Sequence, residues 1–120
     1  MNKPSTVSTA DAHGAFCIAL VTVPGEDVAR TMARALIEQR VAACVNSVSS
    51  VHSTYRWEGE IEEAEETLLL IKTTVARKDD LVRAVEKLHP YDEPEVIFVP
   101  IEGGRSSYLT WIRDSVSTLS

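Results

Sequence analysis

The chain has 120 residues and a mass of 13.2 kDa, the size of one ordinary domain. A hydrophobic fraction of 44% and a charged fraction of 25% are typical of globular proteins and exclude wholesale disorder. The net charge of −6 excludes a nucleic-acid binder and disfavours an anionic membrane surface, because both partners require a surplus of Lys and Arg. We expect a soluble, acidic, single-domain protein.

The first residues carry no recognisable targeting pattern. Residues 1–14 are small and polar, which predicts a disordered tail before a domain spanning residues 15–120. Cys17 and Cys44 are too few for a disulfide scaffold and too far apart for a CxxC motif. The apolar run over residues 16–23 is too short to span a membrane, which takes about twenty residues. We therefore expect a cytoplasmic protein with reduced thiols.

The first third of the domain predicts a strand followed by a helix. Residues 16–23 are apolar and β-branched at both parities, which indicates a strand that is buried on both faces. Pro24 and Gly25 end it. An amphipathic helix then runs from Glu26 to about Gln39, with a stripe formed by Val28, Met32, Ala35 and Leu36.

The middle third predicts a long β-hairpin. Residues 43–56 lack Gly and Pro and are rich in β-branched side chains, and Gly59 can supply the positive φ of a tight turn. Five glutamates within residues 60–66 favour a helix by propensity alone. A strand that enters a two-residue turn needs an antiparallel partner, however, so residues 60–75 are interpreted as the returning strand.

The length of this hairpin bears on assembly. Fourteen residues per arm extend roughly 45 Å, whereas a compact domain of this size has a radius of gyration near 13 Å. Unpaired strand edges in water promote aggregation. We expect the overhang to pair with another copy of the chain; the alternative is a bent or bulged hairpin that stays within its own domain.

The last third predicts a helix, a strand and a second helix. The first helix covers residues 77–88 and stops at His89-Pro90, and a short strand covers residues 95–100. Gly103-Gly104 indicate a loop, after which Ser106 or Ser107 is expected to cap the final helix. Inward-facing side chains are expected at Leu81, Val85, Leu88, Leu109, Ile112 and Val116.

The order of these elements defines the fold class. The predicted order βαββαβ, followed by a helix, gives an α+β ferredoxin-like sandwich with a long hairpin between its second and third strands. Both helices of the repeat lie on one face of a four-stranded antiparallel sheet. The other face is left open, which again favours an oligomer.

Four residues are unusual for a purely structural domain, namely Lys72, Glu95, His89 and Cys44. Lys72 interrupts an apolar strand; either its amine reaches solvent, or it binds an anion or pairs with Glu65 or Glu95. His89 ends a helix, where it either complements the helix dipole or ligates a metal. Cys44 is either a small buried hydrophobe or a soft metal ligand.

Aromatic side chains gather near the ends of the predicted segments. Tyr55, Trp57, Tyr91 and Trp111 are interpreted as core or interface anchors, with a ligand cage as the alternative. The sequence lacks a glycine-rich phosphate loop, a GxSxG motif, an HExxH motif and an acidic calcium loop. We therefore expect a protein that is not an enzyme and that requires no cofactor.

Five motifs follow one another along residues 16–116. They are Arg40-Val-Ala-Ala-Cys-Val-Asn46, Tyr55-x-Trp57-x-Gly59, Glu65 with Leu69-x-x-Lys72-Thr73, His89-Pro-Tyr-x-x-Pro-Glu95 and Tyr108-Leu-x-Trp111. In this order they resemble the CutA family of divalent-cation tolerance proteins. The resemblance implies a ferredoxin-like homotrimer similar to the PII signalling proteins, with hairpins that wrap neighbouring subunits.

The resemblance also implies candidate metal ligands. In bacterial members, copper ligation is attributed to a Cys on the first strand and to a His-His pair before Pro-Tyr. This sequence has Val21 at the first position and Leu88-His89 at the pair, so His89 alone matches. Cys44 is a weaker candidate, because copper favours nitrogen and sulfur ligands.

Three functions follow as hypotheses. The first is a non-enzymatic homotrimer of divalent-cation tolerance that binds copper or another divalent cation weakly through His89. The second is a PII-like sensor that binds a small anionic ligand at Lys72, in an intersubunit cleft that also holds Glu65, Trp57, Tyr91 and Glu95. The third is a structural assembly protein without a small ligand.

Overall fold

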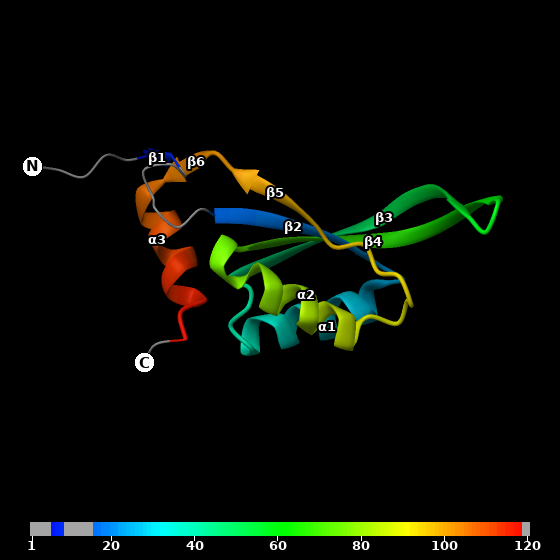
Figure 1. Cartoon of the computed structure of the whole chain (residues 1–120), viewed down its shortest axis with the longest axis horizontal. Helices are drawn as coiled ribbons and strands as arrows, with labels where there is room; N and C mark the ends of the chain where they lie inside the picture. The colour runs from blue at the N-terminus through cyan, green and yellow to red at the C-terminus, as the bar shows by residue number, and fades with distance from the viewer. Residues whose placement is uncertain (1–5, 9–15, 119–120) are drawn as a thin grey trace, which may run out of the picture.

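The computed structural model describes residues 6–8 and 16–118. The elements expected from the sequence occur in the predicted order (Figure 1). They are β2 (Phe16–Val23), α1 (Glu26–Glu38), β3 (Cys44–Trp57), β4 (Glu60–Thr74), the 3-10 turn η1 (Val75–Arg77), α2 (Lys78–Leu88), β5 (Ile97–Ile101) and α3 (Ser106–Ser115).

The main sheet has four antiparallel strands in the order β3-β4-β2-β5. Helices α1 and α2 lie side by side against one face of this sheet, and α3 lies across its end (Figure 1). The α+β ferredoxin-like fold predicted from the sequence is thereby confirmed.

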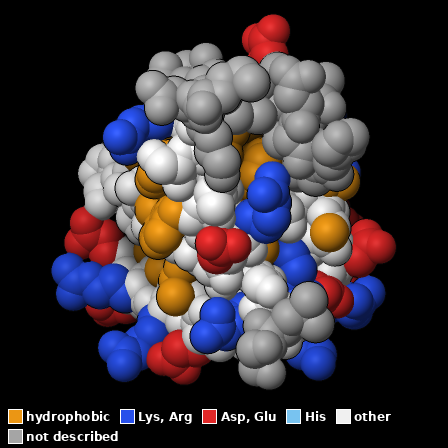
Figure 2. All heavy atoms as spheres, turned by 90° about the vertical axis from the view of Figure 1, so that its left-hand side faces the viewer, with side chains coloured by type: hydrophobic (Ala, Val, Ile, Leu, Met, Phe, Trp, Pro, Cys, Tyr) orange, Lys and Arg blue, Asp and Glu red, His pale blue; other side chains and the backbone are white. Residues whose placement is uncertain are grey.

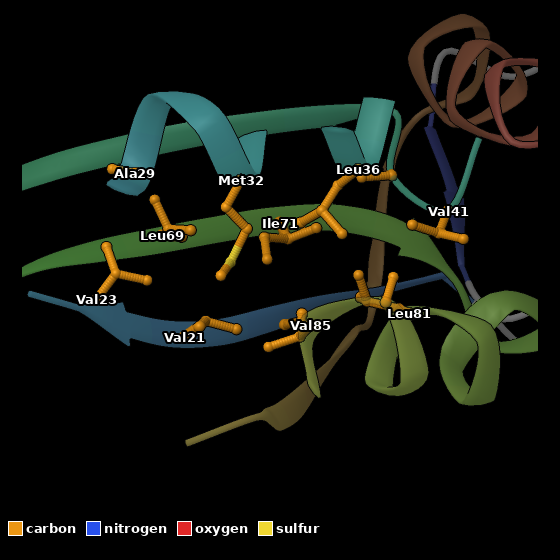
Figure 3. Packing of buried hydrophobic residues seen from close by; sticks show 13 residues of the cluster. Val21, Val23, Ala29, Met32, Leu36, Val41, Leu69, Ile71, Leu81 and Val85 are labelled. Carbon is orange, nitrogen blue, oxygen red and sulfur yellow. The ribbon is translucent and has the colours of Figure 1, made fainter. Parts of the chain in front are cut away.

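The core lies between the two helices and the sheet. Met32 and Leu36 from α1 meet Ile71 on β4 and Val21 on β2, and Val85 from α2 closes the same cluster (Figure 3). All five side chains are fully buried or nearly so. Alternation along β2 and β4 points every second side chain into this core and leaves the intervening ones on the opposite face.

Helix α3 covers a second, smaller cluster at the end of the sheet. Leu109, Ile112 and Val116 are buried there against Phe16 and Ala43, so their predicted inward orientation is confirmed. The predicted cap is wrong: the helix begins at Ser106, and its N-cap residue is Arg105. This end of the molecule mixes basic and acidic side chains around hydrophobic ones (Figure 2).

The hairpin is as long as the sequence predicts. Strands β3 and β4 have 14 and 15 residues and extend well beyond the helices, and the molecule measures 58 Å along its longest axis (Figure 1). Gly59 adopts φ +83° at the tip, as expected. The hairpin is also bulged: one extra residue enters β3 between Val48 and Val51, where Ser50 has φ +61°.

Three boundaries differ from the prediction. Strand β5 begins at Ile97 and not at residue 95, because residues 89–96 form an irregular loop after α2. Gly103 and Gly104 belong to a strand, β6 (Gly103–Arg105), and not to a loop. This strand pairs with β1 (Thr6–Ser8), inside the segment predicted to be a disordered tail; the rest of that segment lies outside the described residues.

Candidate functional site

The open face of the sheet carries apolar side chains in register. Ile18 on β2 lies opposite Val99 on β5, and Leu20 lies opposite both Ile97 on β5 and Leu70 on β4. Val99 and Ile97 are exposed, and Leu70 is half-buried. We call this surface the open face; α1 and α2 lie on the other side of the sheet, and α3 contacts the open face at its end, at Phe16 and Lys72.

A groove of about 690 Å³ lies where the open face meets the base of the hairpin overhang and the loop after α2. Its walls combine aromatic rings, carboxylates and small hydroxyl side chains. We call it the acidic groove, and it is lined by Thr22, Ser53, Thr54, Tyr55, Trp57, Glu66, Pro90, Tyr91, Asp92, Glu93 and Glu95.

Glu66, Tyr91 and Glu95 form the polar centre of the acidic groove. The Tyr91 hydroxyl donates a hydrogen bond of 2.9 Å to Oε2 of Glu66, whose side chain is buried. Burial, together with this hydrogen bond and the charge of Glu66, raises the pKa of Tyr91 to about 12. Burial and the neighbouring Glu66 also raise the pKa of Glu95.

His89 holds the loop that carries Tyr91. Its Nδ1 accepts a hydrogen bond of 3.1 Å from the Tyr91 backbone N–H, which assigns the ring proton to Nε2. Nε2 then donates to the backbone carbonyl of Thr22 at 2.7 Å. The two rings lie 4.6 Å apart between centroids. Both nitrogens of this buried imidazole are therefore engaged, and His89 acts as a positioning residue for the groove.

The bulge in β3 places Tyr55 and Trp57 in the groove. Residues that lie opposite each other share a face, and beyond the bulge Tyr55 is opposite Glu62 and Trp57 is opposite Glu60. Both rings therefore lie on the face of Glu66. Without the extra residue they would point to the opposite face, because a shift of one residue inverts the alternation.

Of the five residues predicted to share a cleft, the structure brings together Trp57, Tyr91 and Glu95. Lys72 lies elsewhere on the sheet, beside α3, where its Nζ is 3.4 Å from the Tyr108 hydroxyl and 5.6 Å from the centre of the Tyr108 ring. Glu65 is exposed on the other face of β4, opposite His52.

Glu66 is the site residue that sequence reasoning missed. Lys72 and Glu66 are six residues apart on one strand, so they share a face, whereas Glu65 is seven residues from Lys72 and faces the other way. The alternation of side chains along a strand was sufficient to place Glu66, and not Glu65, on the face of Lys72.

The two candidate metal ligands lie apart. Cys44 is in register with Lys72 and Ile18, whereas His89 bonds to Thr22, which is four residues further along β2. Four strand residues span about 13 Å. Within the described residues, no group of three or more His, Cys, Asp or Glu side chains is placed to hold a metal ion. His89 and Cys44 therefore do not share a site within one chain.

The residues in the acidic groove can donate a hydrogen bond and attract positive charge. Tyr91 keeps its proton far above neutral pH and so serves as a hydrogen-bond donor. Four carboxylates, Glu66, Asp92, Glu93 and Glu95, give the groove a negative potential, and none of its lining residues is Lys or Arg. An anionic ligand would meet repulsion in this groove of the single chain, whereas the anion-binding intersubunit cleft expected at Lys72 stays a prediction.

Comparison with known proteins places the chain in a family. The family model described as CutA1 divalent ion tolerance protein matches residues 17–115. The chain belongs to the CutA1 family. The divalent-cation tolerance protein CutA from Thermus thermophilus is 50% identical to this chain over 98 residues. The aligned residues cover 82% of this chain and 95% of that relative. Human protein CutA is 43% identical over 107 residues, covering 89% of this chain and 60% of the human protein.

Solved CutA structures have the same fold as this CutA1 family member. The Thermus thermophilus protein superposes with a TM-score of 0.83 at 48% identity, covering 85% of this chain and 99% of that one. CutA1 from Oryza sativa superposes with a TM-score of 0.84 at 39% identity, covering 88% of this chain and 96% of that one. In this CutA1 chain, Val21 is fully buried in the core and Leu88 packs against it, so both positions serve packing here. No helix in residues 6–8 and 16–118 is long and apolar enough to cross a membrane.

Proposed function

We propose that the chain is a non-enzymatic homotrimeric protein of divalent-cation tolerance that binds divalent metal weakly. The family match over residues 17–115 carries this proposal. Relatives from Thermus thermophilus and Pectobacterium atrosepticum are named divalent-cation tolerance proteins. The cytoplasmic location expected from the sequence stays a prediction; the relative from Arabidopsis thaliana is named a chloroplastic protein.

The homotrimer is supported by two surfaces that a single chain leaves unpartnered. The open face exposes Ile97 and Val99, and the overhanging part of β3 presents a free strand edge because β3 is the outer strand of the sheet. Apolar side chains gain roughly 25 cal/mol for each Å² removed from water, and a free edge gains backbone hydrogen bonds when it pairs. Further copies of the same chain would bury the apolar side chains and pair with the free strand edge.

We expect weak metal binding because the candidate ligands His89 and Cys44 already have contacts within the chain. Coordination through either nitrogen of His89 breaks one of its two hydrogen bonds, which costs about 1–3 kcal/mol for a buried group left unpaired. Cys44 is half-buried, and its Sγ lies 3.7 Å from the Asn46 side-chain oxygen. We therefore expect copper to bind only when it is in excess.

Native mass spectrometry of metal-stripped protein titrated with Cu(II) tests the proposal. The expected species is a trimer of roughly 40 kDa, three times 13.2 kDa, that takes up copper only at excess. His89→Gln should reduce this uptake, whereas Cys17→Ser, at a buried position away from the candidate ligands, should leave it unchanged. A trimer that stays bare at excess copper would contradict the metal-binding part, and a monomer would contradict the assembly part.

A structural assembly role is the second candidate, and the open face favours it. In that role the acidic groove and His89 contribute only to holding the subunits together. Loss of copper uptake in His89→Gln with an intact trimer would then have no consequence for cells grown in excess copper. A growth assay in a strain lacking the protein, complemented with each variant, separates the two roles.

A further inference from the structure

The short strand β6 is covered along one edge by the N-terminal strand β1. The pairing is antiparallel, and its register is Thr6 with Arg105, Val7 with Gly104 and Ser8 with Gly103. The two strands form a sheet of their own beside α3, separate from the four-stranded sheet (Figure 1). The family match begins at residue 17, so β1 precedes the family domain, whereas β6 belongs to it. A segment outside that domain therefore covers a strand inside it.

Strand β6 has attachments to the domain that do not involve β1. It follows β5 after a single residue, Glu102, and runs directly into α3 at Ser106. A side-chain carbon of Leu109 on α3 lies 3.6 Å from the position that a Cβ of Gly104 would occupy, so the backbone of β6 lies close to this buried residue. We therefore expect the edge of β6 to keep its shape when β1 leaves it.

The two glycines of β6 give its edge little protection of its own. Natural proteins blunt a strand edge with charged side chains, proline or bulges, or cover it with another segment, because an open edge pairs with other chains. Gly103 and Gly104 bear no side chain and let another backbone approach closely, which leaves Arg105 as the one charged residue of β6. Within the described residues, β1 is the segment that pairs with β6.

A second copy of β6 is the strand that fits this edge. Two identical strands can pair antiparallel about a twofold axis, and residues at equal distances on either side of the centre then lie opposite each other. With the centre between Gly103 and Gly104, the glycines face each other, and Glu102 of one copy lies opposite Arg105 of the other. Both of these charged residues are exposed. Opposite charges in cross-strand pairs are favourable, so residues 102–105 complement themselves.

We propose that β1, residues 6–8, is a built-in cap that keeps β6 from pairing with β6 of a second molecule. When the cap is displaced, two molecules associate through antiparallel β6 strands, with a contact between Glu102 and Arg105 at each end of the junction. The proposal goes beyond divalent-cation tolerance. It does not depend on the native oligomer, because the new contact joins whole molecules or whole assemblies.

Two proline substitutions in the full chain, Val7→Pro together with Ser8→Pro, displace the cap. Neighbouring residues of an antiparallel strand donate to opposite sides, so one of the two prolines removes a hydrogen bond to β6. The matched control is Ala10→Pro with Ala12→Pro, which places two prolines in the same N-terminal segment but outside β1. Light scattering after size exclusion should give a mass that rises above the wild-type mass with concentration for the cap variant. The control should keep the wild-type mass.

Charge reversal identifies the strand that pairs. In the cap variant, the further substitution Arg105→Glu places like charges opposite each other at both ends of the junction. Association should then weaken roughly tenfold, because the unfavourable contact occurs twice. Adding Glu102→Arg as well restores opposite charges in exchanged positions and should restore the association. An association that responds to neither charge change would come from another surface and would overturn the proposal.

Amide hydrogen exchange of residues 103–105 in dilute solution shows whether β1 covers the edge. Exchange there should be faster in the cap variant than in wild type and in the control. Unchanged exchange would mean that β1 does not protect β6 in solution, which contradicts the proposal. Faster exchange in a cap variant that keeps the wild-type mass at high concentration would mean that the open edge does not pair, and the inference would be wrong.

Discussion

At the scale of single residues, the hydrogen bonds of His89 and Tyr91 organise the groove. His89 links the loop after α2 to the backbone of β2, and Tyr91 links the same loop to β4 through Glu66. These bonds join three segments that are far apart in the sequence. The loop has no helix or strand of its own between residues 89 and 96, so these side chains supply its main attachments.

The Tyr91 hydroxyl predicts a pH dependence of stability. Its pKa is raised from 10.0 to about 12 in the folded chain, so the folded state holds this proton more tightly than the unfolded state. The corresponding stabilisation is complete below pH 10 and is lost as the pH rises toward 12. Urea unfolding across this interval should show a smaller fall in the free energy of unfolding for Tyr91→Phe than for wild type.

Tyr108→Phe is the control, because Tyr108 contacts Lys72 outside the groove. Tyr91→Phe should also lose about 1 kcal/mol at neutral pH, the usual contribution of one hydrogen bond. An identical fall in wild type and Tyr91→Phe between pH 10 and about 12 would show that the Tyr91 proton is not held by the fold.

At the scale of elements, the turn and the bulge of the hairpin determine which side chains of β3 lie on the open face. Its tip turn has Glu58 at φ +50° and Gly59 at φ +83°, two positive values that match the right-handed twist of paired strands. The bulge then turns the outer part of β3 so that its aromatic rings lie on the same face of the sheet as Glu66. Because of the turn and the bulge, residues of the β3–β4 hairpin form one wall of the acidic groove.

Comparison of Gly59→Ala with Gly25→Ala isolates the effect of backbone strain at the hairpin tip. An added Cβ meets no atom within 4 Å at either position, but only Gly59 lies in the left-handed region. Gly59→Ala should destabilise the hairpin tip by about 1 kcal/mol, and Gly25→Ala should be neutral or stabilise by up to about 1 kcal/mol. Amide hydrogen exchange in residues 55–62 measures the tip directly, because an overhanging tip can open without global unfolding. Equal exchange in both variants would exclude a role for the Gly59 backbone.

At the scale of the whole molecule, one face of the sheet is covered by α1 and α2 and the other is not (Figure 1). The covered face holds the core, whereas the open face presents apolar side chains of β2, β4 and β5 to water. A fold with two layers leaves this surface exposed to water, which supports the proposed assembly with further copies of the chain.

Val99→Glu should dissociate the expected trimer into monomers. Val99 is exposed on the open face of one chain, so a charge there changes the stability of the isolated chain by only about 0.5 kcal/mol or less. Burial of the same charge between subunits is far more costly. Light scattering after size exclusion measures the mass, with Ile37→Glu on the outer surface of α1 as the control of similar exposure. A trimer that survives Val99→Glu would place the interface elsewhere.

Periodicity, turn residues and length were enough to predict the elements, the ferredoxin-like order and the overhanging hairpin, because these depend on neighbours along the chain. The same local rules place Lys72 and Glu66 on one face. Only the tertiary structure showed that a single extra residue in β3 turns Tyr55 and Trp57 to the face of Glu66, since the pairing register depends on the partner strand and not on β3 alone. It alone also showed that both nitrogens of His89 are bonded, because their partners lie on separate segments brought together by folding.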